Sequence, residues 1–397
     1  MSVDIKVQGF SGAAVAAHVR KKDRLDLALI YSETPAVAAG VFTTSLVKAA
    51  PVKLGIERLK KGRAQAILIN SGIANACTGA EGMRLARAAG SLVAEALAID
   101  EELVQVSSTG VIGEQLRLER FQDAMDGLVE KLAPAGLADV AKAIMTTDLV
   151  PKMAVRTVTI GGKSVKLAGV AKGSGMIMPN MATMLGFVIT DAAVEQEALA
   201  EMLKTASDCS FNRITVDGDT STNDTVLLLA NGLAGNPVID KVSAHKAVFQ
   251  EVLNDLMKDL ALQIVRDGEG ATKLITVRVT GAPTDKAAVD AARTVANSAL
   301  VKTAFFGEDA NWGRIIGALG RSGVEFDADL VDIAFDDVVM VKNGLGQGAS
   351  VEELATKVLK QKEFFVNIDL KAGSGEGEMY TCDMSIDYVK INADYRS

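Results

Sequence analysis

The sequence predicts a layered α/β fold with mixed sheets. Short apolar runs typical of strands alternate with amphipathic helical segments, and several strands follow one another directly in the second half. With 397 residues, 49% of them hydrophobic, the chain holds enough apolar material for a large core. It has only 7 prolines and no Ser/Gly linker or repeat, which favours one compact body over separate domains joined by linkers.

Strands are expected where apolar residues alternate or run continuously. In chain order, the expected strands are 25–31, 64–70, 103–107, 164–170, 184–189, 225–230, 274–280, 331–335, 364–370 and 379–391. Helices are expected where apolar residues recur with a helical period. These segments are 83–97, 118–131, 196–208, 244–266, 285–301 and 351–361. Ser350 and Glu353 have capping-box spacing and predict how the last helix begins.

Composition excludes several classes of protein. The net charge is −8 and no basic stripe is visible, which argues against a nucleic-acid partner. The N-terminal residues lack the pattern of a signal peptide. Residues 173–190 are uncharged but contain Pro179 and several glycines, so we expect a buried irregular segment rather than a membrane span. Cys77, Cys209 and Cys382 lack C-x-x-C spacing, which excludes a zinc ribbon and suits a reducing cytoplasm.

Histidine chemistry and phosphate loops have little support. His18 and His245 are the only histidines and neither has a carboxylate at metal spacing, which favours a nucleophile that needs no histidine. Residues 162–164 end like a phosphate loop, but Thr157 stands where its first glycine should be. Residues 344–349 follow an expected strand and open a helix with Gly-x-Gly spacing, so a nucleotide-binding oxidoreductase stays an alternative.

Residues 172–185 form the most informative segment. Gly173 and Gly175 permit backbone geometry closed to other residues, and Pro179 stops a helix from forming. The small Ala182 leaves the carbonyl before Thr183 open to attack by the threonine hydroxyl. Cleavage there would free the α-amine of Thr183, and the ordinary pKa of such an amine, about 7.7–8.0, suits a general base.

This segment resembles the cleavage motif of the ornithine acetyltransferase family. Further blocks that resemble the family occur in order at 70–72, 74–79, 107–113, 211–224, 309–314 and 392–397. Together they extend over nearly the whole chain. Departures are small: Ser45 and Ile73 stand where the family pattern has Asn, and Ser397 replaces the commoner terminal Thr.

The resemblance implies a layered mixed-sheet α/β sandwich of the ornithine acetyltransferase and self-cleaving aminopeptidase type. It implies that the bond between Ala182 and Thr183 is cleaved, with Thr183 as nucleophile and Thr109 and Gly110 as oxyanion donors. The implied substrate contacts are Thr146, Lys172, Thr183, Glu269, Asn392 and Ser397. Lys172 would bind a carboxylate. Glu269 would either pair with a substrate ammonium or steer the amine of Thr183, and these roles stay open.

The implied reaction is ping-pong transfer of acetyl from N²-acetylornithine to glutamate in arginine biosynthesis. It needs no cofactor and no metal, although Asp217, Asp219 and Asp224 cluster in the sequence. The implied chains, 1–182 and 183–397, form one compact body and assemble into a cytoplasmic heterotetramer, with no nucleic-acid or membrane partner. Whether acetyl-CoA is also a donor stays open. A related self-cleaving aminopeptidase and an uncleaved binding protein of the same fold are further alternatives.

Overall fold

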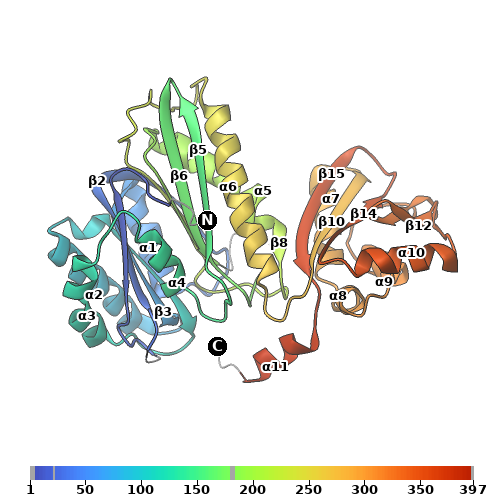
Figure 1. Cartoon of the computed structure of the whole chain (residues 1–397), viewed down its shortest axis with the longest axis horizontal. Helices are drawn as coiled ribbons and strands as arrows, with labels where there is room; N and C mark the ends of the chain where they lie inside the picture. The colour runs from blue at the N-terminus through green and yellow to red at the C-terminus, as the bar shows by residue number, and fades with distance from the viewer. Residues whose placement is uncertain (1–4, 21–22, 179–183, 395–397) are drawn as a thin grey trace. The chain divides into compact units, whose positions relative to one another are not determined.

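The computed structural model describes residues 5–20, 23–178 and 184–394, which form two compact units (Figure 1). Unit 1 contains the residues up to Asn212 and the segment Asp219–Ile264. Unit 2 contains the segment Arg213–Gly218 and the residues from Val265 onward. The expected division into chains 1–182 and 183–397 concerns cleavage and stays a prediction.

The sheet of unit 1 is mixed, as the sequence predicts. In the described part of the chain it has eight strands, in the order β4-β3-β2-β9-β7-β6-β5, and β1 pairs with β2. The β3–β4 and β7–β9 pairs are parallel and the other pairs are antiparallel. The strands are β1 (Phe10–Val15), β2 (Leu27–Phe42), β3 (Arg63–Ile73), β4 (Val104–Val111), β5 (Lys152–Ile160), β6 (Lys163–Lys172), β7 (Leu185–Thr190) and β9 (Thr225–Ala230).

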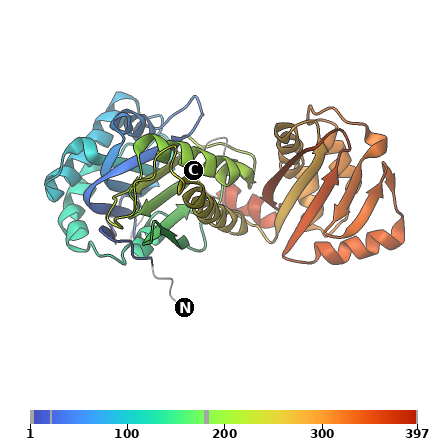
Figure 2. The ribbon, with the colours of Figure 1, turned by 90° about the horizontal axis from the view of Figure 1, so that it is seen from above.

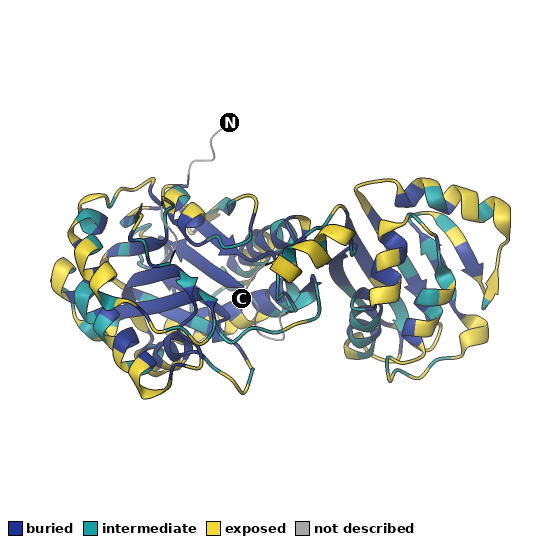
Figure 3. Ribbon diagram, turned by 90° about the horizontal axis from the view of Figure 1, so that it is seen from below, coloured by how far each residue is buried: buried dark blue, intermediate teal, exposed yellow. Residues whose placement is uncertain are grey.

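Helices cover both faces of this sheet. They are α1 (Ala50–Arg58), α2 (Gly79–Leu97), α3 (Leu118–Glu130), α4 (Leu137–Ala143), α5 (Gln196–Cys209) and α6 (Lys246–Arg266). Leu27 and Leu29 of β2 pack in one core with α2 and α3, whereas Ala28 and Ile30 pack in another with α4. Because successive side chains of a strand point to opposite faces, this alternation creates a layered unit. Figure 3 shows the strands buried and the outer helix faces exposed.

Unit 2 is built on a second mixed sheet, in the order β13-β12-β11-β14-β10-β15-β8 (Figure 2). Its strands are β8 (Ile214–Thr215), β10 (Leu274–Ala282), β11 (Asp332–Phe335), β12 (Val338–Lys342), β13 (Leu345–Gly346), β14 (Glu363–Asp369) and β15 (Gly375–Cys382). Its helices are α7 (Asp285–Ala296), α8 (Ala299–Phe306), α9 (Trp312–Leu319), α10 (Ala349–Leu359) and α11 (Ile386–Asp394). The described residues of the two units also form short 3₁₀ helices, namely η1 (Leu59–Lys61), η2 (Glu101–Leu103), η3 (Phe211–Arg213) and η4 (Ala328–Leu330).

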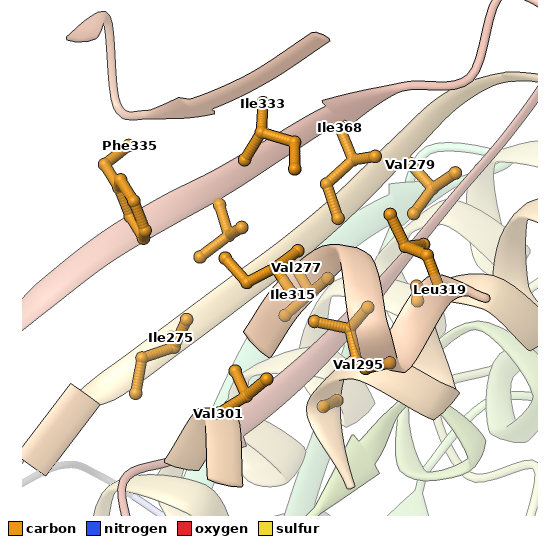
Figure 4. Close-up of a cluster of buried hydrophobic side chains, with 14 of the residues drawn as sticks. Ile275, Val277, Val279, Val295, Val301, Ile315, Leu319, Ile333, Phe335 and Ile368 are labelled. Atoms are coloured by element: carbon orange, nitrogen blue, oxygen red, sulfur yellow. The ribbon is translucent and has the colours of Figure 1, made fainter. Parts of the chain in front are cut away.

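Alternate residues of β10 form the centre of the unit 2 core. Ile275, Val277 and Val279 are buried in one cluster with Val295 of α7 and Ile315 of α9 (Figure 4). The residues between them are more polar, and Arg278 lies over the ring of Phe365.

Several predicted elements need correction. The expected helix 285–301 is two helices, because Asn297 ends α7 and accepts a hydrogen bond from Thr215 Oγ1. The expected strand 379–391 ends at Cys382 and is followed by α11. The predicted capping box is wrong, because α10 begins after Gly348 and has no side-chain cap.

The glycine motif at 344–349 has a structural role. Asn343 and Gly344 have φ values of 47° and 72°, the geometry of the tight turn that joins paired antiparallel strands, here β12 and β13. A Cβ atom on Gly344 would lie 2.7 Å from the carbonyl oxygen of Ala328. This hairpin accounts for the first glycine without a nucleotide.

Within the described ranges, no helix is both long and apolar enough to cross a membrane.

Candidate functional site

Thr109 and Gly110 lie near the end of β4, where it runs parallel to β3. Gly110 lies beside Gly72 and has a φ of +133°. A Cβ atom at this position would lie 2.2 Å from the carbonyl carbon of Gly72, so only glycine fits. Thr109 is buried, at 8% exposure. Its hydroxyl and the neighbouring N–H are donor types that stabilise a developing oxyanion.

Residues at the start of β9 join this strand end to the beginning of β7. Asn223 Nδ2 donates to the carbonyl oxygen of Ser108 at 2.8 Å. The carboxylate of the next residue, Asp224, accepts the N–H of Met184. That N–H belongs to the peptide bond between Thr183 and Met184. Hydrogen bonds therefore connect the residue before Thr109 with the residue after Thr183.

Asp148 connects two of the predicted substrate residues. Its Oδ2 accepts the backbone N–H of Thr146 at 2.9 Å. Its Oδ1 accepts the N–H of Gly173 at 2.8 Å and the Lys152 ammonium at 2.7 Å. Because Gly173 follows Lys172, this one carboxylate brings Thr146 and the end of β6 together. Burial raises the pKa of Asp148, but the charges of Lys172 and Lys152 and the hydrogen bonds outweigh burial and lower it to about 2.

Lys172 is the last residue of β6 and lies opposite Leu185 of β7. It is 9% exposed and interacts electrostatically with Asp148 and Asp224. Among residues 5–20, 23–178 and 184–394, its ammonium has no hydrogen-bond partner and no ion pair within 4.0 Å. A nearly buried ammonium that makes no such bond within the described residues suits the carboxylate of a bound ligand.

Asp224 is a feature of this site to which the sequence assigned no role. It is 2% exposed, and its Oδ2 has no hydrogen-bond partner in the part of the chain that the structure describes. Burial raises the pKa of this carboxyl well above its ordinary value, while Lys172, Ser221 and the N–H of Met184 oppose the shift. Position 224 stood out in the sequence only as part of the 211–224 block and of an acidic cluster.

An open depression of about 320 Å³ adjoins Thr146. It is lined by Arg24, Leu25, Lys142, Met145, Thr146 and Asp148. The side chain of Arg24 donates to the carbonyl oxygen of Met145, which fixes the chain just before Thr146. This depression gives a small molecule access to Thr146.

Glu269 and Asn392, two of the predicted substrate contacts, contact each other in unit 2. Asn392 Nδ2 donates to Glu269 Oε2 at 2.8 Å. Glu269 is 8% exposed, in a loop held by Ser385 Oγ, which donates to the carbonyl oxygen of Gly270 at 2.6 Å. Ala182, Thr183 and Ser397 lie outside the described residues. The structure thus groups Thr109, Gly110, Thr146 and Lys172 in unit 1, and Glu269 with Asn392 in unit 2.

A family model and two similar proteins each match nearly the whole chain. A family model described as the ArgJ family matches residues 11–397. The arginine biosynthesis bifunctional protein ArgJ of Desulfotalea psychrophila is 58% identical, over 99% of this chain and 100% of its own length. The protein of the same name from Geobacter sulfurreducens is 53% identical, with the same coverage of 99% and 100%. The crystal structure of the arginine biosynthesis bifunctional protein from Bacillus halodurans has 46% identity and a TM-score of 0.52, and the match covers 54% of this chain and 100% of that chain.

Proposed function

The chain belongs to the ArgJ family, and on that premise we propose that it transfers acetyl from N²-acetylornithine to glutamate in arginine biosynthesis. It is a glutamate N-acetyltransferase of that pathway. The word bifunctional in the names of its relatives supports a second activity, the acetylation of an amino acid by acetyl-CoA.

Thr183 is the nucleophile, freed when the bond after Ala182 is cleaved. Residues 183–397 are 215 of the 397 residues, which is 54% of the chain. The solved Bacillus halodurans chain is matched over 100% of its length and covers 54% of this chain. A solved chain that begins at the counterpart of Thr183 would give this value, which supports two chains, 1–182 and 183–397.

In the first half-reaction, Thr183 Oγ attacks the acetyl carbonyl of N²-acetylornithine. The α-amine of Thr183 takes the hydroxyl proton, and the hydroxyl of Thr109 and the N–H of Gly110 stabilise the oxyanion. The proton then passes to the α-nitrogen of ornithine, which leaves the acetyl group on Oγ. In the second half-reaction, the amine of glutamate attacks this ester, accepts the acetyl group and restores the hydroxyl.

The substrate contacts are Thr146, Lys172, Glu269, Asn392 and Ser397, together with the nucleophile itself. Lys172 binds the carboxylate that N²-acetylornithine and glutamate share. Of the two roles considered for Glu269, we favour pairing with a substrate ammonium, because its carboxylate already accepts a hydrogen bond from the predicted substrate contact Asn392. Two copies of each chain form a heterotetramer in the cytoplasm, and the three free thiols suit that reducing compartment.

One observation carries the proposal. Hydrogen bonds tie the peptide that follows Thr183 to the strand that bears Thr109 and Gly110, and the Lys172 ammonium interacts with Asp224 of the same connection. The residue after the proposed nucleophile, the oxyanion donors and the proposed carboxylate receptor are therefore linked through the start of β9, which supports the proposal.

The intact mass of the purified protein under denaturing conditions tests the cleavage. Fractions of 182/397 and 215/397 of 41.6 kDa predict chains of roughly 19 and 22.5 kDa. Thr183→Ala should leave one chain and abolish transfer of acetyl from N²-acetylornithine to glutamate. Thr190→Ala, which removes a buried hydroxyl at the other end of β7, is the matched control and should be cleaved. A single chain from active wild-type protein, or activity in Thr183→Ala, would contradict the mechanism.

A further inference from the structure

Asn223 lies where segments far apart in the sequence meet in space. It is 5% exposed, just before β9. Its Nδ2 donates to the carbonyl oxygens of Ala74 and Ser108, at 2.6 and 2.8 Å. Its Oδ1 accepts the hydroxyl of Thr222 at 2.6 Å. Every polar atom of the carboxamide therefore has a partner, and both amide hydrogens point to backbone carbonyls of the segments that follow β3 and form β4.

The backbone on the other side of Asn223 is held to the strand that follows the nucleophile. The N–H of Thr225 donates to the carbonyl oxygen of Met184 at 3.1 Å, and the carboxylate of Asp224 accepts the N–H of Met184. The carbonyl oxygen of Asp224 also accepts the N–H of Thr43 at 3.0 Å. Residues 224 and 225 are thus fixed to Met184 by two hydrogen bonds, and Asn223 has little freedom to shift relative to that strand.

We propose that Asn223 is a positioning residue, whose carboxamide holds the oxyanion donors Thr109 and Gly110 in place relative to the nucleophile. This proposal rests on the proposed function, which assigns Thr109, Gly110 and Thr183 their roles. Within the described residues, the carboxamide of Asn223 contacts the backbone carbonyls of Ala74 and Ser108 and the hydroxyl of Thr222. It acts through the carbonyl of Ser108, one peptide bond before Thr109.

Other hydrogen bonds hold the ends of β3 and β4 together, so Asn223 is not needed for that structural purpose. Ser108 Oγ donates to Asn70 Oδ1 at 2.6 Å, and Asn70 Nδ2 donates to the carbonyl oxygen of Ile73 at 2.9 Å. The parallel pairing of β3 with β4 adds a ladder that is regular from Ala66 to Gly72 and shifts its register at Ile73. These bonds keep the ends of β3 and β4 together without Asn223. Loss of its carboxamide therefore frees that pair to move relative to Met184, and this displacement affects catalysis before it affects folding.

The test compares Asn223→Asp with a matched control, Asn236→Asp. Asn236 is 6% exposed, and its Nδ2 donates to the carbonyl oxygens of Ala193 and Pro237 at 3.3 and 2.8 Å. Both substitutions replace a buried amide that serves two carbonyls by an oxygen that cannot donate, so their costs in stability should be similar. Asn223→Ala and Asn236→Ala form a second pair, in which water can enter the vacated space.

We expect Asn223→Asp to lower kcat about 10²–10³-fold, the effect of losing one oxyanion donor. The KM values for N²-acetylornithine and glutamate should change little, since no substrate contact is removed. Asn236→Asp should lower the melting temperature to a similar extent with kcat unchanged. In a Thr109→Val background, Asn223→Asp should lower kcat less than it does in wild type, because one of the two donors that Asn223 positions is already absent.

Other outcomes overturn the proposal. If the kcat values of Asn223→Asp and Asn236→Asp fall together, or the Thr109 and Asn223 effects multiply fully, Asn223 has no positioning role. If both Asn223 variants fail to fold while both Asn236 variants fold, its role is structural. Wild-type protein is assayed first: absence of acetyl transfer there would contradict the proposed function, whereas active wild type with unaffected Asn223 variants would contradict only this inference.

Discussion

Replacing Gly110 by alanine tests the geometry of the oxyanion donors most directly. The added Cβ atom would lie 2.2 and 2.4 Å from the carbonyl carbon and oxygen of Gly72, and 2.6 Å from the backbone nitrogen of Ile73. All three are backbone atoms of β3, so no flexible side chain can yield. The φ of +133° adds strain for any residue with a Cβ atom.

The magnitude follows from these two terms. Backbone strain at such a φ costs about 1–3 kcal/mol. Overpacking that forces backbone to shift costs about 1–3 kcal/mol more. Gly113→Ala is the matched control, because its φ is +86° and its Cβ atom would have no neighbour within 4 Å. We therefore expect Gly110→Ala to be the more destabilising of the two by about 1–3 kcal/mol.

Urea unfolding followed by circular dichroism measures this difference, and acetyl transfer measures its effect on catalysis. A shift of the Gly110 N–H should lower kcat by about 10²-fold or more, which is the usual loss for one misplaced donor. Equal destabilisation by Gly110→Ala and Gly113→Ala would refute the close approach of β4 to β3. Excess destabilisation with full kcat in the folded fraction would refute the role of Gly110 in the oxyanion hole.

Three further changes test the charged groups. Asp148→Asn should destabilise unit 1 by about 3–5 kcal/mol at neutral pH, because it removes the carboxylate that pairs with the fully buried Lys152 ammonium. In wild type, the ionised Asp148 carboxylate stabilises the folded state fully above pH 3.8, and this stabilisation is lost as the pH falls through about 2. The melting temperature of Asp148→Asn should therefore depend less on pH over that range than the melting temperature of wild type. Equal pH dependence of the two proteins would contradict this. The melting temperature of Asp224→Asn should rise relative to that of wild type as the pH increases above 3.8, because wild type loses stability when its folded state must give up the tightly held proton of Asp224. A difference in melting temperature that shrinks as the pH increases would contradict the raised pKa. Glu269→Gln keeps an oxygen for Asn392 but removes the charge, so the KM for N²-acetylornithine should rise about 10–100-fold in steady-state assays; a fall in kcat alone would instead favour the amine of Thr183 as its partner.

Regular elements with a strong local pattern could be predicted from the sequence. The helices α2, α3, α5 and α6 and the strands β3, β6 and β9 lie close to their expected ranges, because burial of one face imposes a period on the sequence. Short or less periodic elements such as β1, α1 and α4 were not predicted. β1 pairs with β2 in the sheet of unit 1, and α1 and α4 pack against that sheet. All three are too short to show a period.

Boundaries set by contacts between distant residues were also missed. Asp383 accepts the backbone N–H groups of Thr272 and Lys273 at 2.8 and 2.9 Å, just after β15 ends. Asn297 interrupts the expected helix 285–301 where its side chain accepts the hydroxyl of Thr215. Neither partner lies within one helical turn or one strand of the residue concerned, so no local pattern could indicate these ends.

The amino-acid sequence by itself determined the α/β class, the family-like blocks and the types of residue that carry the proposed chemistry. Only the tertiary structure decided that Asp148 joins Thr146 to the end of β6, and that Asn223 connects Ser108 with the strand after Thr183. The physical reason is that periodicity records which face of an element is buried, whereas a hydrogen bond between residues 223 and 108 depends on how the strands pair. A buried carboxamide must satisfy its donors, and only the folded chain shows which carbonyls do so.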